Sequence, residues 1–84
     1  MYVIKRDGTQ VLFNKEKIEN AINKAFLEVD GILYETDTSR DIADDIEKLN
    51  LTLTVEEIQN LIEDYLMRSE RKDVARAYIR YRYR

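Results

Sequence analysis

The spacing of apolar side chains along the chain predicts a β-hairpin followed by helices. Residues 2–5 and 10–13 are short runs rich in β-branched and aromatic side chains. They bracket Asp7-Gly8, a dipeptide that favours a tight hairpin turn. Because an isolated two-stranded hairpin is only marginally stable in water, we expect it to pack on the rest of the chain.

Four amphipathic helices are predicted after the hairpin, since apolar residues recur there at intervals of three and four positions. Asn14 can cap the first helix, and Asp30-Gly31 can end it. Thr54 and Glu57 match a capping box at the start of the third helix. The apolar positions are Ile18, Ala21, Ile22, Ala25, Phe26 and Val29 in the first helix, Ile42, Ile46 and Leu49 in the second, Ile58, Leu61, Ile62, Tyr65 and Leu66 in the third, and Val74, Ala75, Tyr78, Ile79 and Tyr81 in the fourth.

The links between these helices carry weaker signals. The first link contains Leu33 and Tyr34, which we expect to be buried, and Thr38 or Ser39 is expected to cap the second helix. Residues 51–53 alternate in polarity and are too few for a helix, so they form either a short third strand or an extended link. A sheet lying over a helical bundle would bury the apolar faces of both.

We therefore expect residues 1–84 to form one domain with an α+β fold. A small N-terminal β-hairpin, with or without the short third strand, covers a four-helix bundle. The absence of Cys and His excludes disulfides, zinc sites of the usual kind and Cys or His nucleophiles. No apolar run approaches the roughly 20 residues of a membrane span, so a cytoplasmic domain that contacts no membrane is expected.

The net charge of −3 conceals an uneven distribution. Residues 1–24 hold five Lys or Arg and three Asp or Glu, residues 25–67 hold two and twelve, and residues 68–84 hold seven and two. Two interpretations stay open for these basic ends and the acidic middle. The charges are ordinary solvated surface, or the two basic ends meet in the fold and bind a multiply charged anion.

The hairpin offers the first candidate ligand-binding residues. Alternate side chains of a strand share a face, so Val3 and Lys5 lie together. An apolar contact beside a cation suits a ligand with a base and a phosphate, and it equally suits a plain core with an extended lysine. Arg6 and Lys17 add positive charge, and Lys17 opposes the dipole of its own helix unless an anion lies between them.

The C-terminal residues form a second basic region, in which Arg76, Arg80 and Arg84 make one stripe with Tyr78 and Tyr81 beside it. Basic residues at a helix C-terminus are favourable for the helix dipole alone. Such a stripe could also bind single-stranded nucleic acid. The sequence pI near 5.0 and the acidic middle favour a compact anion over a polymer. Adjacent carboxylates on a helix diverge and there is no Gly-rich phosphate loop, so no catalytic residues are predicted.

The segment VIKRDGTQVLFNKEKIENAINKAF resembles the opening of an ATP-cone domain. TVEEIQNLIE and VARAYIRYR are similar to the third and fourth helices of that family, so the resemblance covers essentially the whole chain in order. ATP-cones are regulatory nucleotide-binding modules of many ribonucleotide reductases and of the bacterial repressor of reductase genes. The repressor carries a cysteine zinc ribbon before its cone, whereas this chain begins at Met1 with the cone and has no Cys.

The resemblance therefore implies the N-terminal cone of a reductase, most like the anaerobic, class III enzymes, whose parent chain would be a ribonucleoside-triphosphate reductase. The implied effectors are ATP or dATP with Mg²⁺, and the implied partners are the catalytic body of that reductase and other cones in an oligomer. A cone of a transcriptional regulator, a small nucleic-acid-binding module and a ligand-free interaction domain are the alternatives. The implied nucleotide-binding residues are Val3 near the adenine, Lys5, Arg6 and Lys17 at the triphosphate, Asn14 beside the base or ribose, Val55 and Gln59 along the pocket, and Arg80 or Arg84 from the fourth helix.

One departure from the family pattern concerns the ribose. The aerobic enzymes often have His where this chain has Gln59, so the resemblance implies no specific ribose contact at that position. Val11, in turn, cannot hydrogen-bond to a base through its side chain.

Overall fold

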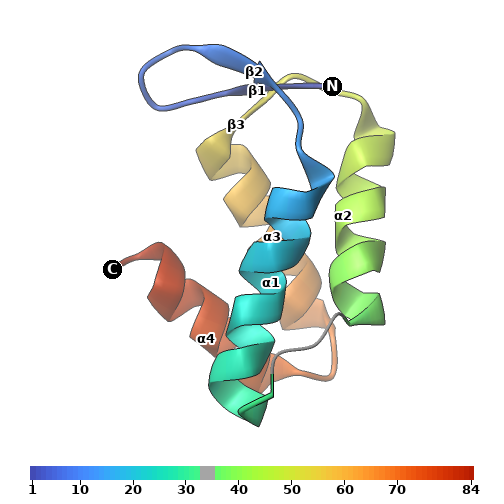
Figure 1. Ribbon diagram of the computed structural model, residues 1–84, viewed down its shortest axis with the longest axis vertical. Coiled ribbons are helices and arrows are strands. Elements are labelled where there is room, and N and C mark those ends of the chain that lie inside the picture. Colours follow the sequence, from blue (N-terminus) through green and yellow to red (C-terminus); the bar gives the residue numbers. More distant parts are fainter. Residues whose placement is uncertain (33–35) are drawn as a thin grey trace.

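Four helices form a bundle, and a three-stranded sheet lies across one end of it (Figure 1). This is the expected α+β fold, which the computed structural model describes for residues 1–32 and 36–84. Within this part of the chain, no helix is long and apolar enough to cross a membrane. The elements in order are β1 (Tyr2–Ile4), β2 (Gln10–Leu12), α1 (Lys15–Asp30), α2 (Asp37–Leu49), β3 (Leu53–Thr54), α3 (Val55–Arg68) and α4 (Lys72–Arg82).

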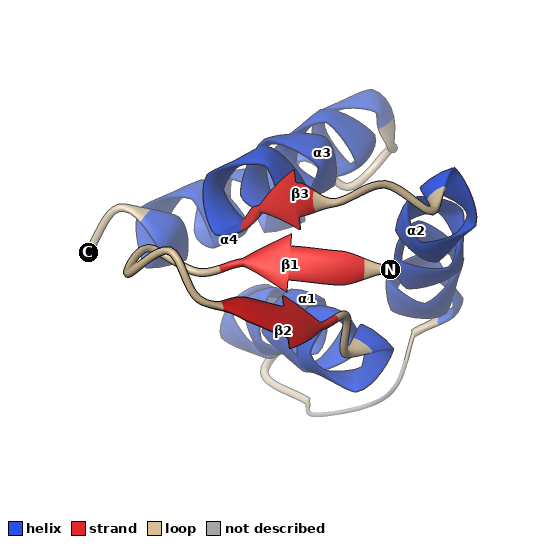
Figure 2. Cartoon of the chain, turned by 90° about the horizontal axis from the view of Figure 1, so that it is seen from above, coloured by secondary structure: helices blue, strands red, loops and turns tan. Residues whose placement is uncertain are grey.

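The first strand of the chain lies in the middle of the sheet (Figure 2). β1 pairs with β2 in antiparallel orientation, with Val3 opposite Val11, and with β3 in parallel orientation, with Val3 opposite Leu53. The third strand is therefore present, but it comprises residues 53 and 54 rather than 51–53. The hairpin turn is tight because Gly8 adopts φ 86° and the Asp7 carboxylate accepts a hydrogen bond from the backbone N–H of Thr9 at 3.0 Å.

The predicted helix ends of α1 and α3 are confirmed. The Asn14 side chain accepts a hydrogen bond from the Glu16 backbone N–H at 3.1 Å, and Gly31 ends the helix with φ 75°. At the start of α3, Thr54 Oγ1 accepts from the Glu57 N–H at 3.1 Å and the Glu57 carboxylate accepts from the Thr54 N–H at 3.0 Å. This reciprocal pair is the capping box that the sequence predicts.

The cap of α2 is Thr36, so the prediction of Thr38 or Ser39 was wrong. Thr36 Oγ1 accepts from the Ser39 backbone N–H at 2.9 Å, and the Ser39 hydroxyl donates to the Thr36 carbonyl at 2.9 Å. Both side chains are buried, as is Asn23 of α1, whose amide oxygen lies 3.4 Å from Thr36 Oγ1. The helix therefore starts earlier than predicted, and its buried cap also contacts Asn23 on a neighbouring helix, a contact that sequence spacing does not reveal.

Two predicted packing residues are more exposed than expected. Leu49 is 42% exposed at the end of α2, and Tyr81 is 44% exposed on α4, where Ala77 is buried instead. The buried face of α4 therefore lies nearer to its N-terminal half. Leu33 and Tyr34, which we expected to be buried, lie outside the described residues.

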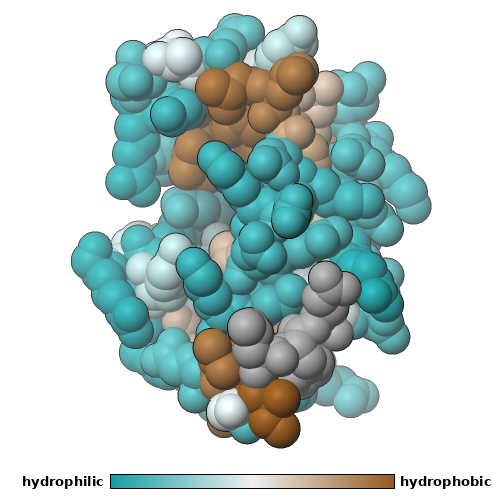
Figure 3. Space-filling view, in the orientation of Figure 1, coloured by the Kyte–Doolittle hydropathy of each residue, from teal (hydrophilic) through white to brown (hydrophobic). Residues whose placement is uncertain are grey.

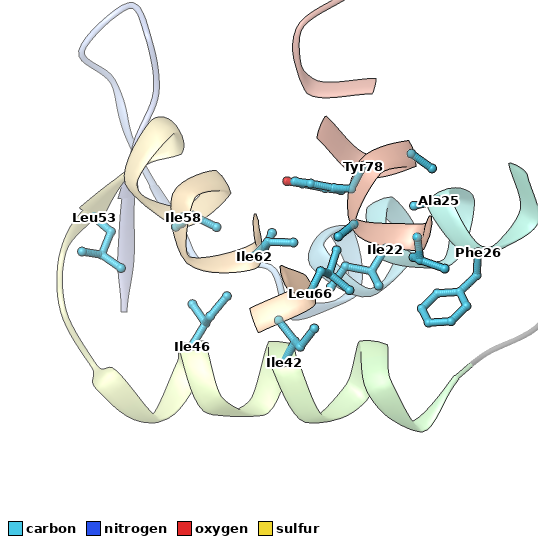
Figure 4. Packing of buried hydrophobic residues seen from close by; sticks show 13 residues of the cluster. Ile22, Ala25, Phe26, Ile42, Ile46, Leu53, Ile58, Ile62, Leu66 and Tyr78 are labelled. Carbon is cyan, nitrogen blue, oxygen red and sulfur yellow. The ribbon is translucent and has the colours of Figure 1, made fainter. Parts of the chain in front are cut away.

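The hydrophobic core joins all four helices to the inner face of the sheet (Figure 4). Side chains of α1 pack against both α2 and α4, and α3 packs against α4. The sheet contributes Leu53, and Val3 and Phe13 pack against the same cluster. The core residues labelled in the figure are Ile22, Ala25, Phe26, Ile42, Ile46, Leu53, Ile58, Ile62, Leu66 and Tyr78.

Arg71 ties the far ends of α1 and α4 together. Its guanidinium lies 2.6 Å from a carboxylate oxygen of Asp30 and 3.1 Å from one of Asp73. Hydrogen bonds to these two carboxylates raise the pKa of Arg71 further and lower the pKa of Asp73. Ion pairs of Arg71 therefore connect the ends of α1 and α4 that lie opposite the sheet.

Candidate functional site

A cleft of about 400 Å³ lies between the sheet and the helices. We call it the hairpin cleft. Its volume lies within the range of small-molecule sites, roughly 300–1,000 Å³. Its lining comes from both hairpin strands and from three helices, α1, α3 and α4: Val3, Lys5, Val11, Leu12, Phe13, Asn14, Lys17, Ile18, Ala21, Val55, Ile58, Gln59, Ile62, Tyr78 and Tyr81.

One side of the cleft is an exposed apolar lip. Hydrophobic side chains gather at the sheet end of the molecule (Figure 3), where Val11 is 39% exposed and Leu12 is 69% exposed. Both residues belong to β2 and line the cleft. A ligand with a flat apolar group would cover this lip and remove its apolar surface from water.

Two lysines and one amide bring polarity to the same cleft. Lys5 directly follows β1 and lines the cleft together with Val3, and Lys17 projects from the first turn of α1, beside the cap residue Asn14. Neither lysine forms an ion pair with any residue in the described ranges 1–32 and 36–84. Their charges, together with the N–H groups at the start of α1, favour an anionic group at this end of the cleft.

The α4 side of the cleft is formed by Tyr78 and Tyr81, with an ion pair between α4 and α3 close to them. The Tyr78 hydroxyl is neutral near pH 7, as in any tyrosine, and can donate a hydrogen bond, and burial raises its pKa further, to about 12. Arg82 Nη1 lies 3.0 Å from Glu63 Oε1, and only 8% of the arginine side chain is exposed. On α3, the buried Gln59 Oε1 has no hydrogen-bond partner among the described residues.

The structure brings most, but not all, of the expected ligand-binding residues to the cleft. Arg6 does not line it: its Nε donates to Glu56 Oε1 at 2.8 Å. Arg80, on α4, and Arg84, two residues beyond its end, do not line it either, because their guanidinium groups lie beside α1, 3.8 and 3.6 Å from Glu28. The expected residues that do line the cleft are Val3, Lys5, Asn14, Lys17, Val55 and Gln59.

Tyr78 and Tyr81 line the cleft, and Arg82 lies on the same helix without lining it; none of the three was among the predicted site residues. Arg82 falls between Arg80 and Arg84, so it projects from another side of the helix, toward α3. The packing pattern placed Tyr78 and Tyr81 on the inner side of α4, and that signal could have assigned them to the cleft wall. Arg84 instead lines a second cavity of about 170 Å³ together with Lys24, Glu28 and Tyr81.

The described residues contain no group of three or more His, Cys, Asp or Glu that could hold a metal ion. The hairpin cleft thus combines apolar walls with ammonium groups and a helix N-terminus. This arrangement defines a class of binding module for ligands with an apolar ring and an anionic group.

A family model described as the ATP cone domain matches residues 1–84. The chain belongs to the ATP-cone family. The fold, the cleft and this membership together support a nucleotide-binding regulatory module, which agrees with the resemblance seen in the sequence.

The curated relatives are ribonucleotide reductases. The vitamin B12-dependent ribonucleoside-diphosphate reductase of Thermoplasma acidophilum is 43% identical over 86 residues, which cover 95% of this chain and 11% of that protein. The anaerobic ribonucleoside-triphosphate reductase of Escherichia coli is 37% identical over 84 residues, covering 98% of this chain and 12% of that protein. The subunit alpha of the ribonucleoside-diphosphate reductase of Chlamydia pneumoniae is 37% identical over 91 residues, or 95% of this chain and 9% of that protein. The chain therefore spans about a tenth of the length of these relatives.

Proposed function

We propose that this chain is an allosteric regulatory domain that binds ATP or dATP, with Mg²⁺, in the hairpin cleft and controls a ribonucleotide reductase. The proposal is supported by one observation in this member of the ATP-cone family: one part of the cleft is apolar, and another part carries two lysines. Its apolar lip and walls suit a purine, and Lys5 and Lys17 lie where a polyphosphate would be bound.

In the proposed complex the adenine packs against Val3, Val11 and Val55, which come from β1, β2 and the start of α3. The triphosphate extends toward Lys5 and Lys17, with Asn14 beside the base or ribose. Mg²⁺ would be carried by the phosphates and water, since it is commonly bound through substrate phosphates rather than by an all-protein site.

Gln59 supplies a polar group that suits a nucleotide. Its buried Oε1 lacks a partner among the described residues, and leaving such an acceptor unsatisfied costs about 1–3 kcal/mol. A donor on the ligand, such as the adenine amino group or a ribose hydroxyl, would remove that penalty. We therefore propose that Gln59 accepts a hydrogen bond from the nucleotide.

Arg80 and Arg84 do not contact the nucleotide in this arrangement of the side chains. Arg80 or Arg84 would have to leave Glu28 to reach a phosphate, whereas Lys5 and Lys17 already face the cleft. A contribution from Arg80 or Arg84 thus requires α4 or its side chains to rearrange when the nucleotide binds.

Control of the parent enzyme requires more than binding. A ligand shifts an equilibrium only if its affinity differs between two states, and ATP and dATP differ by one ribose hydroxyl. We propose that the two states differ in how the domain contacts the catalytic body of the reductase or another cone. The reductase relatives, of which this chain matches a small part, support that arrangement.

Calorimetric titration of the chain with ATP, dATP, GTP, CTP and single-stranded DNA tests the proposal. We expect binding of ATP and dATP in the presence of Mg²⁺, much weaker binding of GTP and CTP, and no hydrolysis. Equal affinity for all four nucleotides would overturn the adenine assignment. Tight binding of the DNA with none of the nucleotides would instead favour a nucleic-acid-binding module.

A further inference from the structure

Glu56 is the point at which the two basic ends of the chain meet. From the N-terminal hairpin, Arg6 Nε donates to its carboxylate at 2.8 Å. From the C-terminal helix, Arg82 Nη2 lies 3.5 Å from its backbone carbonyl oxygen. The Glu56 carboxylate thus pairs with Arg6 of the hairpin, while its main-chain carbonyl oxygen lies within reach of Arg82 from the C-terminal helix.

Both partners of this contact are sequence neighbours of residues that line the hairpin cleft. Lys5 and Val55 both line the cleft, and they directly precede Arg6 and Glu56 in the sequence. Glu56 is the second residue of α3, where backbone N–H groups favour a negative charge. Its carboxyl pKa is lowered by a hydrogen bond from its own backbone N–H and by Arg6, so Glu56 is ionised near neutral pH.

We propose that Glu56 competes with the triphosphate for Arg6. In the ligand-free domain, the ion pair with Glu56 keeps the guanidinium of Arg6 away from the cleft. When a nucleotide triphosphate binds, its phosphates replace Glu56 as the partner of Arg6. This inference rests on the proposed function, because it concerns the regulation of affinity at the same site.

The exposure of the pair permits such an exchange. The Arg6 and Glu56 side chains are 70% and 49% exposed, so their ion pair is weak and solvated. A triphosphate carries more negative charge than one carboxylate and presents several oxygens to a guanidinium. The exchange therefore favours the nucleotide, but the competition with Glu56 lowers the affinity for ligands that use Arg6.

The competition makes a selective prediction. Glu56 should weaken the binding of ligands whose phosphates reach Arg6, and it should not affect adenosine, which has no phosphate. Glu56→Gln keeps the size of the side chain and removes its charge, so it should lower the Kd of ATP by roughly two- to fivefold, the scale of an exposed ion pair. Glu70→Gln, which removes the same charge in the link between α3 and α4, is the matched control and should leave the Kd of ATP unchanged.

The test is a double-mutant cycle measured by calorimetry with ATP and adenosine on the 84-residue chain and on its Glu56→Gln, Arg6→Ala and doubly substituted variants. We expect the gain from Glu56→Gln to disappear in the Arg6→Ala background. A gain of equal size in both backgrounds would overturn the exchange, because Glu56 would then act by direct repulsion of the phosphates. An unchanged Kd in Glu56→Gln would overturn it as well.

A second measurement does not depend on substitutions. In NMR titrations of the unaltered chain, saturating ATP should shift the Nε–H signal of Arg6 and raise the carboxyl pKa of Glu56, because its cationic partner leaves and phosphates approach. An unchanged Glu56 pKa with ATP bound would contradict the proposal. If the unaltered chain binds no ATP at all, the proposed function itself fails, which separates that failure from a failure of the competition.

Discussion

Arg82 Nη1 and Glu63 Oε1 lie 3.0 Å apart beside the tyrosine wall of the hairpin cleft, with only 8% and 21% of their side chains exposed. The pair joins the last residue of α4 to the middle of α3. The two atoms are close enough for an ion pair but do not meet hydrogen-bond geometry, so the pair acts through charge attraction between α4 and α3.

Removing one partner of this pair should destabilise the domain more than removing both. Glu63→Met leaves Arg82 mostly buried without its carboxylate, and loss of a buried partner costs about 3–5 kcal/mol. Since Glu63 retains some exposure, we expect a loss of about 2 kcal/mol in the free energy of unfolding, measured with denaturant. Glu63→Met combined with Arg82→Met should recover most of it. A single variant as stable as the parent chain would show that the pair contributes little.

The lysines of the cleft should matter for affinity and the arginines beside Glu28 should not. Lys5→Ala and Lys17→Ala should each weaken ATP binding by about 1–3 kcal/mol, the scale of a charge-assisted hydrogen bond, with little change in stability because both residues are exposed. Arg80→Ala and Arg84→Ala are the comparison, as both side chains lie beside Glu28 of α1 rather than in the cleft. Calorimetric Kd values for the four variants distinguish the two groups. A large loss in Arg80→Ala would show that α4 rearranges around the phosphates.

Nucleotide binding should stabilise the domain and protect particular segments. A ligand at a hundredfold excess over its Kd contributes about 2.7 kcal/mol when only the folded chain binds it. In a domain of this size that corresponds to a rise in Tm of about 10–20 °C. Amide exchange should slow first in the hairpin and at the start of α3, and least in α2, which contributes no lining residue. Protection strongest in α2 would place the ligand elsewhere.

Acid should weaken the ion pairs that Asp73 and Asp44 form. Hydrogen bonds from Arg71 and Lys15 lower the folded-state pKa of Asp73 and Asp44 below their usual 3.8. A carboxyl group with a lowered pKa contributes stability that is fully present above its unfolded value and is lost as the pH falls through the folded value. The free energy of unfolding should therefore fall below about pH 4. In Arg71→Met this loss should be shallower, because Asp73 then has no strong partner, and an identical pH profile in that variant would contradict this account.

Local signals in the sequence predicted most of the fold. Asp7-Gly8, Asn14 and the Thr54–Glu57 box act over two to four residues, so each could be recognised without knowing the rest of the chain. The parts that were missed depend on distant contacts. The cap residue Thr36 contacts Asn23 of another helix, and no local sequence pattern predicts that contact.

The candidate site shows the same limit. Alternation along β1 is a local rule, and it correctly turned Val3 and Lys5 to one side, where the cleft lies. The sequence also predicted that Arg80 and Arg84 share one side of a helix, but α4 ends at Arg82, and helical periodicity does not say which neighbour these side chains meet. The neighbour is Glu28 of α1, and Arg82 between them is turned toward α3.

The position of β1 in the centre of the sheet has a consequence for the order of folding. The β1–β2 hairpin joins residues close in sequence, so it can form early. The sheet is completed only when Val3 pairs with Leu53, which lies fifty positions further along the chain. Val55, the first residue of α3, follows β3 directly and lines the cleft. The cleft therefore becomes complete only when this long-range parallel pairing closes. During synthesis, such a domain would become able to bind its ligand only after most of its chain has emerged.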